Sequence, residues 1–296
     1  MLEAYDQLLA DPNDPLINRT INGDLYFPGS TFKLLVAAAA IDSGQFTPED
    51  AFPNPARLAL PLSTDTITNS NGGTCGSGTT VTIATALRLS CNIPFAELGL
   101  ALGEDTLAQY TEAFGFGTAF EVPMEATPSS FPTGLDDAQL MLSSFGQYDV
   151  RVTPLQMALV SAAIANGGNL MQPTLLDRII APDLSIVQQP EPTLSSQPIS
   201  RVTAETMTRL MVDGVSNGAA SNARIEGVAV AGKTGTAENG DEAPYTLWFT
   251  GFAPADNPQV AIAVVVEDGG GRGQTGSGNQ IAAPIAKRVL EAVLSR

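Results

Sequence analysis

The stretch PGSTFKLLVAAAAIDSG, residues 28–44, is the most informative segment of this 296-residue chain. Pro28 and Gly29 break the preceding structure, and the apolar run over residues 34–41 leaves no polar face for solvent. A helix that is hydrophobic on almost every side belongs in a protein interior. The sequence therefore predicts a buried helix over residues 30–41, with Ser30 in its first turn and Gly44 as its stop. The run is too short to cross a bilayer.

Elsewhere the chain places helices before strands. Thr153-Pro154-Leu155-Gln156 has the form of a capping box with proline at the first helical position, and Gly167 should end this helix. Further helices are expected over residues 81–89, 203–215 and 281–294, strands over residues 227–236, 246–252 and 260–267, and a surface loop or short strands over residues 173–198. The last strand is apolar throughout and should be buried on both faces. This pattern predicts an α+β fold with an antiparallel sheet flanked by helices, the C-terminal helix packing on the sheet.

Composition excludes several classes of function. Hydrophobic residues make up 44% of the chain, which is enough for a sizeable core. With 31 acidic and 14 basic residues the formal charge is −17, and such a surface repels nucleic acid. The absence of histidine removes Ser–His and Cys–His catalytic pairs and nearly all histidine metal sites. We expect no metal and no cofactor. Proton transfer must use other groups, and the chain has three lysines, Lys33, Lys233 and Lys287.

Ser30 and Lys33 lie three residues apart on the predicted helix, so both side chains should project from one face. A serine hydroxyl becomes a nucleophile when a base takes its proton. In a chain without histidine, a neutral lysine one turn away is the natural base. The same spacing also arises by chance, and Lys33 would then be a side chain that extends from a helix end to solvent.

Two further motifs are weak signals when each is taken alone. Ser90-Cys91-Asn92 follows a predicted helix, but the triplet Ser-x-Asn is common and recurs at Ser277-Gly278-Asn279. Lys233-Thr234-Gly235-Thr236 ends a predicted strand. An inward-facing lysine with hydroxyls beside it would bind a carboxylate, and Gly235 would let a substrate backbone approach. An ordinary loop and a solvated lysine at a strand end are the alternatives.

Ser-x-x-Lys, Ser-x-Asn and Lys-Thr-Gly occur in this order in penicillin-binding proteins and serine β-lactamases, which the chain therefore resembles. The segments at residues 26–33, 146–168 and 248–254 are similar to those of the class B transpeptidases, so the resemblance covers nearly the whole chain. The penicillin-binding protein A group of actinobacteria has a cysteine between the serine and the asparagine of the second motif. The chain resembles this group because a cysteine lies between Ser90 and Asn92. The resemblance implies a transpeptidase domain over residues 1–296 that includes a mainly helical subdomain over roughly residues 46–150.

The resemblance also implies a chemical role for each motif residue. Ser30 would attack the carbonyl between the two terminal D-alanines of a peptidoglycan stem peptide, and neutral Lys33 would take its proton. Burial and a second cation, Lys233, would lower the pKa of Lys33. Ser90 would pass the proton to the departing D-alanine, and Asn92 would hold the amide on the acyl side.

The third motif would bind the substrate. The resemblance implies that Thr234 and Thr236 bind the terminal carboxylate of the stem peptide beside Gly235. The backbone N–H groups of Ser30 and Thr236 would form the oxyanion hole. The catalytic residues that the resemblance implies are therefore Ser30, Lys33, Ser90, Asn92 and Lys233, with Thr234, Gly235 and Thr236 as the substrate-binding residues.

The chain departs from the family in two ways. Class B enzymes carry a membrane helix, a pedestal and a strand hairpin before the serine motif, and we expect these to be absent here. The chain would then be the extracytoplasmic part of a protein at the outer face of the cytoplasmic membrane. Second, the sequence between Asn92 and Lys233 shows no segment similar to the Glu-containing deacylation loop of class A β-lactamases. The acyl-enzyme formed with penicillin should therefore be long-lived.

Cys75 and Cys91 are the two cysteines of the chain. An even number in a wall enzyme that works outside the cytoplasm permits a disulfide, and two reduced, buried thiols are the alternative. The bond would tie the glycine-rich loop over residues 69–78 to the second motif. It would stabilise the fold by about 3 kcal/mol in the chain-entropy estimate.

We therefore expect a D,D-transpeptidase that cross-links stem peptides through a serine acyl-enzyme, in cell division or septal wall synthesis. Its expected partners are stem peptides ending in D-Ala-D-Ala, β-lactam antibiotics, a membrane glycan polymerase and division proteins. A serine β-lactamase or D,D-carboxypeptidase has the same motifs, and a non-catalytic β-lactam sensor or scaffold is a third possibility.

The glycine-rich stretch at residues 269–276 lacks the Gly-Lys-Ser/Thr ending of a phosphate-binding loop, so a mobile connection is expected there.

Overall fold

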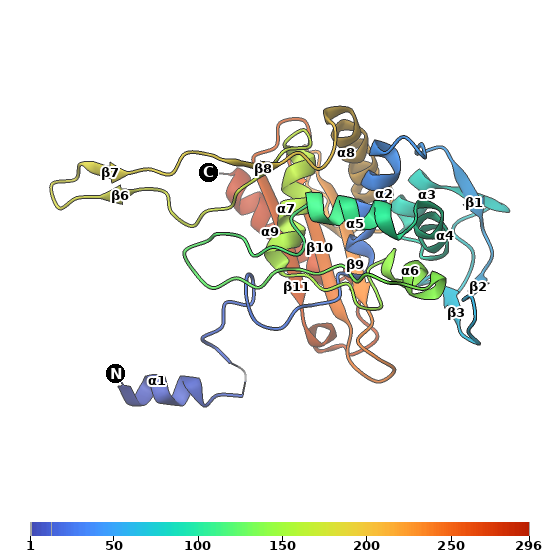
Figure 1. Ribbon diagram of the computed structural model, residues 1–296, viewed down its shortest axis with the longest axis horizontal. Helices are drawn as coiled ribbons and strands as arrows, with labels where there is room; N and C mark the ends of the chain where they lie inside the picture. Colours follow the sequence, from blue (N-terminus) through green and yellow to red (C-terminus); the bar gives the residue numbers. More distant parts are fainter. Residues whose placement is uncertain (1, 13, 296) are drawn as a thin grey trace.

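The computed structural model describes residues 2–12 and 14–295, with an antiparallel sheet between layers of helices (Figure 1). Within these residues the main sheet has three strands in the order β11–β10–β9. They are β9 (Ala231–Ala237), β10 (Thr246–Ala253) and β11 (Val260–Val266). Trp248 of β10 pairs with Gly235 of β9 and Val265 of β11. The predicted α+β class is confirmed.

The central strand β10 separates two apolar cores and is buried along its whole length. Trp248 belongs to the core that contains the buried side chains of α7 (Pro154–Ala165). Phe249, the next residue, belongs to the core under α9 (Ala282–Leu294). Successive residues of a strand point to opposite faces, so this one strand contributes to both cores. The prediction that the C-terminal helix packs on the sheet is confirmed.

The helices opposite α9 place Lys33 in the core, directly after the turn that carries Ser30. Helix α8 (Arg201–Ser216) packs against β9, and α2 (Lys33–Asp42) packs against α8. The eight residues of α2 from Lys33 to Ala40 are all buried. The predicted buried helix is therefore present at the centre of the molecule.

Residues 46–150, predicted to be a mainly helical subdomain, contain four helices and two small antiparallel strand pairs, β1–β4 and β2–β3. The helices are α3 (Ile83–Leu89), α4 (Ile93–Leu102), α5 (Glu104–Ala113) and α6 (Asp137–Ser143). The strands are β1 (Ala51–Pro53), β2 (Arg57–Ala59), β3 (Thr66–Thr68) and β4 (Thr80–Thr82). That this region is a separate subdomain stays a prediction.

The segment between α7 and α8 forms the short strands expected there. Strand β5 (Leu170–Met171) pairs with β8 (Leu194–Ser196), and β6 (Ile179–Ile180) pairs with β7 (Ile186–Gln188). Figure 1 shows the β6–β7 hairpin and helix α1 (Leu2–Leu9) extending away from the body of the molecule. In the described part of the chain, every helix is too short or too polar to cross a membrane.

Three expectations are wrong in detail. The helix predicted from Ser30 begins at Lys33, because Gly29, with φ +51°, and the two residues after it form the 3-10 turn η1 (Gly29–Thr31). The strand predicted from residue 227 begins at Ala231, since residues 225 and 228 pair in an isolated bridge. Strand β11 is half-exposed rather than buried on both faces: it lies at one edge of this sheet, whereas α8 and η1 pack against β9 at the other edge and bury it.

The predicted capping box of α7 is half correct. The Thr153 hydroxyl accepts a hydrogen bond from the backbone N–H of Gln156 at 3.1 Å. The side chain of Gln156 does not return to the backbone of Thr153, because it donates to the carbonyl of Phe114 at 2.8 Å. The helix ends at Ala165, slightly before the predicted Gly167. The hydrogen bond to a distant segment therefore replaces the second hydrogen bond of the capping box.

Candidate active site

The residues predicted from the three motifs meet at one place. Ser30 lies in η1, and Lys33 is the first residue of α2. Ser90 directly follows α3, and Asn92 directly precedes α4. Lys233 lies in β9. The Lys33 Nζ atom lies 2.9 Å from Ser30 Oγ, 2.9 Å from the Ser90 carbonyl oxygen and 2.8 Å from Asn92 Oδ1. Lys233 Nζ lies 2.6 Å from Ser90 Oγ. Ser90 therefore contacts both lysines, Lys33 through its carbonyl oxygen and Lys233 through its hydroxyl.

The contacts of Lys33 determine where its lone pair points. The side chain is fully buried. This burial, and then the charge of Lys233, hold the pKa of Lys33 well below its ordinary value of 10.5. In its neutral form the amine has two hydrogens and one lone pair, and the Ser90 carbonyl and the Asn92 Oδ1 can only accept. These two acceptors take both hydrogens, so the lone pair faces the hydroxyl of Ser30.

Ser90 and Lys233 form a second pair on the other side of Lys33. Ser90 has a left-handed backbone conformation, with φ +63°, and a strained backbone at such a position is typical of functional sites. Lys233 also lies 2.8 Å from the carbonyl oxygen of Thr234. Burial lowers the pKa of Lys233 to about 7. This lysine can therefore gain or lose a proton near neutral pH, next to the hydroxyl of Ser90.

The two threonines of the third motif have different hydrogen-bond roles. The Thr234 hydroxyl donates to the carbonyl oxygen of Ala219 at 3.0 Å. The Thr236 hydroxyl accepts from the backbone N–H of Gly278 at 3.2 Å. An accepting hydroxyl keeps its own hydrogen for another partner. Thr236 is therefore the better placed of the two to donate to a carboxylate.

Gly235 is the residue of the third motif that lies against the segment carrying Ser30. A Cβ atom at this position would lie 2.9 Å from the carbonyl oxygen of Pro28 and 3.1 Å from the Cβ of Trp248. Glycine lets β9 pack against the Ser30 turn, which we define as residues 28–31. The structure thus gives Gly235 a packing role, whereas the role predicted from the sequence was the approach of a substrate backbone.

Ser30 lines two cavities. The larger, of about 620 Å³, includes Ser30, Asn92 and Thr236 in its wall, and Ser277 from the second copy of Ser-x-Asn. The smaller, of about 260 Å³, shares Ser30, Asn92 and Thr236 with it and adds the apolar side chain of Phe145. Ser30 is therefore open to ligands from two sides.

In the part of the chain that the structure describes, no group of His, Cys, Asp and Glu side chains could hold a metal ion.

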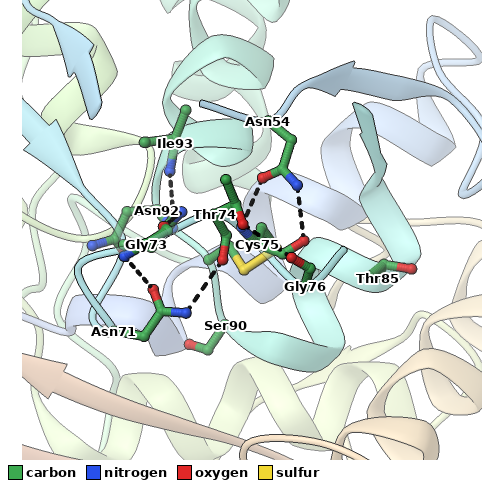
Figure 2. The surroundings of a disulfide bond; sticks show 12 residues. Asn54, Asn71, Gly73, Thr74, Cys75, Gly76, Thr85, Ser90, Asn92 and Ile93 are labelled. Atoms are coloured by element: carbon green, nitrogen blue, oxygen red, sulfur yellow. Dashed lines mark hydrogen bonds between the residues drawn. A yellow bond between two sulfur atoms is a disulfide. The ribbon is translucent and has the colours of Figure 1, made fainter. Parts of the chain in front are cut away.

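The disulfide predicted between Cys75 and Cys91 is present. Figure 2 shows that Asn54 binds the first cysteine: its side chain accepts from the Cys75 N–H at 2.7 Å and donates to the Cys75 carbonyl at 3.1 Å. The second cysteine lies between Ser90 and Asn92. The glycine-rich loop is thereby joined covalently to the second motif.

Sequence reasoning missed the residue that holds this motif from the loop side. Asn69 is 3% exposed, and its Oδ1 accepts from the backbone N–H groups of Asn92 at 2.9 Å and Ile93 at 3.2 Å. The carbonyl of Thr68 accepts from Asn92 Nδ2 at 2.9 Å. The sequence shows only an asparagine in a glycine-rich loop, and nothing local indicates its distant partners.

Comparison with known proteins agrees with the arrangement of the three motifs. Residues 3–291 match the family model of the penicillin binding protein transpeptidase domain. The chain is 41% identical to the peptidoglycan D,D-transpeptidase PbpA of Mycolicibacterium smegmatis and 38% identical to that of Mycobacterium tuberculosis, in each case over 99% of this chain and 60% of the relative. It thus spans about 60% of the length of these curated relatives.

Solved structures agree with the sequence relatives. Penicillin-binding protein A from M. tuberculosis, as its ceftriaxone acyl-enzyme complex, superposes with a TM-score of 0.94 at 37% identity, covering 99% of this chain and 66% of that one. The penicillin G acyl-enzyme complex of the same protein gives a TM-score of 0.91 at 37% identity, with the same coverage. The arrangement of the three motifs, the family match and these likenesses lead to one conclusion. The chain belongs to the penicillin-binding protein transpeptidase domain family.

Proposed function

We propose that this chain is the catalytic domain of a serine D,D-transpeptidase that cross-links peptidoglycan stem peptides and is acylated by β-lactams. One observation carries the proposal: the 2.9 Å contact between Lys33 Nζ and Ser30 Oγ in a site where both hydrogens of a neutral amine have other acceptors. The named activity of the PbpA relatives and the β-lactam acyl-enzymes formed by similar structures support it.

Acylation begins when neutral Lys33 takes the proton of Ser30. The Ser30 oxygen attacks the carbonyl carbon between the two terminal D-alanines, and an ester forms as the carbon–nitrogen bond breaks. The N–H groups of Ser30 and Thr236 stabilise the charge that develops on the carbonyl oxygen, by roughly 3–4 kcal/mol for each donor. The lowered pKa of Lys33 favours the neutral amine, which is the form that can act as a base.

While Lys33 holds the proton of Ser30, Ser90 gives its own hydroxyl proton to the leaving group. Its hydroxyl lies 2.6 Å from Lys233 Nζ, which reprotonates it, and its carbonyl lies 2.9 Å from Lys33 Nζ. The departing nitrogen takes the proton and free D-alanine leaves. An amine from a neighbouring stem then attacks the ester and gives up a proton to Ser90 and Lys233, and Lys33 returns its proton to the Ser30 oxygen as the ester bond breaks. The products are a new amide and the restored hydroxyl of Ser30.

The third motif and Asn92 recognise the donor peptide. The Thr236 hydroxyl donates to the terminal carboxylate. Thr234 and Gly235 line the same cavity, and Lys233 Nζ lies next to them, 2.8 Å from the Thr234 carbonyl oxygen. Asn92 Nδ2 has two hydrogens, of which the Thr68 carbonyl takes one. The second hydrogen is directed to the amide on the acyl side of the substrate.

We place the domain outside the cytoplasmic membrane, in septal wall synthesis or cell division. Its disulfide suits an oxidising compartment. A membrane glycan polymerase and division proteins are the proposed partners, and an anchor elsewhere in the protein would hold the domain at the membrane. The role in peptidoglycan synthesis itself is supported by the named activity of the PbpA relatives.

Labelling with a fluorescent penicillin tests the proposal. The chain should form a covalent band that Ser30→Ala abolishes. Lys33→Ala should keep the fold and lose the band, because the hydroxyl then has no base. Lys287→Ala is the matched control, since Lys287 is a lysine on the exposed side of α9 that pairs with Glu291. A band that persists in Lys33→Ala would remove Lys33 from the role of base.

Turnover separates the proposed transpeptidase from the other enzymes with these motifs. A serine β-lactamase would hydrolyse nitrocefin steadily, at many cycles per second. A D,D-carboxypeptidase would release D-alanine from a stem peptide whether or not an acceptor amine is present. A non-catalytic scaffold would form no covalent band. The proposal expects a long-lived penicillin adduct and a cross-linked product that depends on the amine.

A further inference from the structure

Asn69 caps a helix that lies 23 residues away in the sequence. The residue that precedes α4, Asn92, makes no capping hydrogen bond with its own side chain. Asn69 Oδ1 instead accepts the two backbone N–H groups at the helix start, those of Asn92 and Ile93. Its Nδ2 donates to the carbonyl of Gly73 at 2.9 Å, which closes the loop on itself. One buried side chain therefore joins the loop to the start of α4.

The same loop determines how the side chain of Asn92 is turned. Thr68 accepts from Asn92 Nδ2 at 2.9 Å, so the opposite atom of the amide, Oδ1, is directed to Lys33 Nζ at 2.8 Å. Asn69 fixes the backbone of Asn92, and the neighbouring Thr68 fixes its amide. The position of Oδ1 thus depends on two adjacent loop residues.

We propose that Asn69 is a positioning residue for acylation, which acts by holding Asn92 Oδ1 where it takes one hydrogen of the neutral Lys33 amine. This inference rests on the proposed function. With Oδ1 in place, the Ser90 carbonyl and Asn92 together occupy both hydrogens of Lys33, and the lone pair faces Ser30. Without Asn69 the start of α4 can shift, and an amine hydrogen is free to turn toward the Ser30 oxygen. The base is then present but misdirected.

The disulfide cannot replace this contact. It joins the loop at Cys75 to residue 91, whereas the hydrogen bonds of Asn69 reach residues 92 and 93, which begin α4. The covalent bond limits how far the loop can move, and the side chain of Asn69 sets the orientation of the helix start. A displacement of about 1 Å is enough to slow a positioned reaction by roughly 100-fold.

The experiment measures the rate constant of acylation by a fluorescent penicillin at saturating concentration, on the upper pH plateau of each variant. Asn69→Ala should lower this rate roughly 10- to 100-fold. Asn71→Ala is the matched control: Asn71 lies in the same loop, and its side chain binds Gly73 and Thr74 rather than α4 (Figure 2). It should acylate at the rate of the parent.

A double-mutant cycle distinguishes positioning from a general loss of structure. If Asn69 acts through Asn92, Asn69→Ala/Asn92→Ala should be no slower than Asn92→Ala alone. Additive losses would overturn the inference, as would a parental rate in Asn69→Ala or an equal loss in Asn71→Ala. A parent chain that forms no adduct would instead overturn the proposed function, and this inference with it.

Asn69→Asp provides a second test if the alanine variant does not fold. Aspartate keeps the acceptor for both N–H groups of the helix start, where a negative charge is favourable. It puts a second acceptor oxygen in place of the donor to the Gly73 carbonyl, so the repulsion it introduces falls on the loop and not on α4. We expect acylation within about threefold of the parent on the pH plateau. A loss as large as that of Asn92→Ala would show that the bonds to α4 are not what matters, and would overturn the inference.

Discussion

Gly146 lies so close to Gly29 that a Cβ atom at residue 146 would be 2.1 Å from the Gly29 carbonyl oxygen. The N–H of Gly29 donates to the carbonyl of Gly146 at 2.9 Å, and Gly146 has φ +81°. Backbone therefore touches backbone directly behind the Ser30 turn. Any side chain at residue 146 would push this turn, and Ser30 with it, away from Lys33.

Gly146→Ala is expected to slow acylation by a fluorescent penicillin at least tenfold, since the hydroxyl and its base would separate. Gly44→Ala is the matched control. Gly44 also has positive φ, +71°, but an added Cβ would meet no atom within 4 Å. Both variants should lose about 1–2 kcal/mol of stability from backbone strain alone. Equal acylation by the two variants would show that the contact with Gly29 does not position Ser30.

A second glycine contact joins two helices beside the site. A Cβ atom at Gly99 of α4 would lie 1.6 Å from Ser144 Oγ and 2.3 Å from Ser144 Cβ, at the end of α6. Gly99→Ala should lower the free energy of unfolding by about 1–3 kcal/mol, because this interface has no space for a methyl group. Urea denaturation measures the loss.

The exchange Gly99→Ala/Ser144→Gly tests whether the contact itself is the cause. Removing the side chain of Ser144 makes room for the new methyl group, so the double variant should be more stable than the sum of the two single changes predicts. Ser144→Gly alone should cost about 1 kcal/mol, from the lost hydrogen bond to the Leu140 carbonyl and the added chain flexibility. Strict additivity would mean that the two positions do not interact.

Local patterns in the sequence were enough to predict the elements that make most of the site. The spacing of Ser30 and Lys33 predicts adjacent side chains, and their 2.9 Å contact agrees, although the helix itself begins three residues later than expected. Helical spacing survives because a 3-10 turn leads directly into α2. The apolar run after Lys33 predicts burial; Leu34 to Ala40 are buried and Ile41 is partly buried.

Contacts between distant segments were beyond the reach of these patterns. Asn69 and Gly146 act on residues more than twenty positions away, and neither lies in a motif whose chemistry indicates a partner. The error at β11 has the same origin, because a strand's apolar composition does not tell whether it lies at the centre or the edge of a sheet. The side chain of Gln156 likewise donates to the carbonyl of Phe114, in another segment, and not to the backbone of Thr153.

The disulfide should contribute to stability through the unfolded state. It closes a loop across a sequence separation of 16, for which the chain-entropy estimate gives about 3 kcal/mol. Reduction of the parent chain should therefore lower its free energy of unfolding by about this amount in urea denaturation. Cys75→Ala/Cys91→Ala, measured with and without reductant, is the control and should not respond. A parent that is equally stable in both conditions would contradict the expectation.

Burial of Lys33 makes stability depend on pH. Its pKa in the folded chain lies well below 10.5, so between the folded value and 10.5 the unfolded chain binds more protons than the folded one. Stability must therefore rise with pH through this window, by up to ~1.4 kcal/mol per pH unit for this group, and level off above it. Lys33→Met removes this group's part of the slope and leaves the part due to Lys233, whose pKa is also lowered by burial, to about 7.

The comparison that isolates this effect is the free energy of unfolding of Lys33→Met minus that of the parent, measured in urea at pH 7 and pH 9.5. The difference should fall as pH rises, because Lys233 contributes to both chains and only the parent also regains the cost of deprotonating Lys33. Any constant loss from the unpaired Ser90 carbonyl and Asn92 Oδ1 cancels between the two pH values. Lys287→Met, at an exposed ion pair with Glu291, should change stability by less than about 1 kcal/mol at both. A pH-independent difference for Lys33→Met would mean that Lys33 stays charged in the folded chain, and Lys33 could not then serve as the base for Ser30.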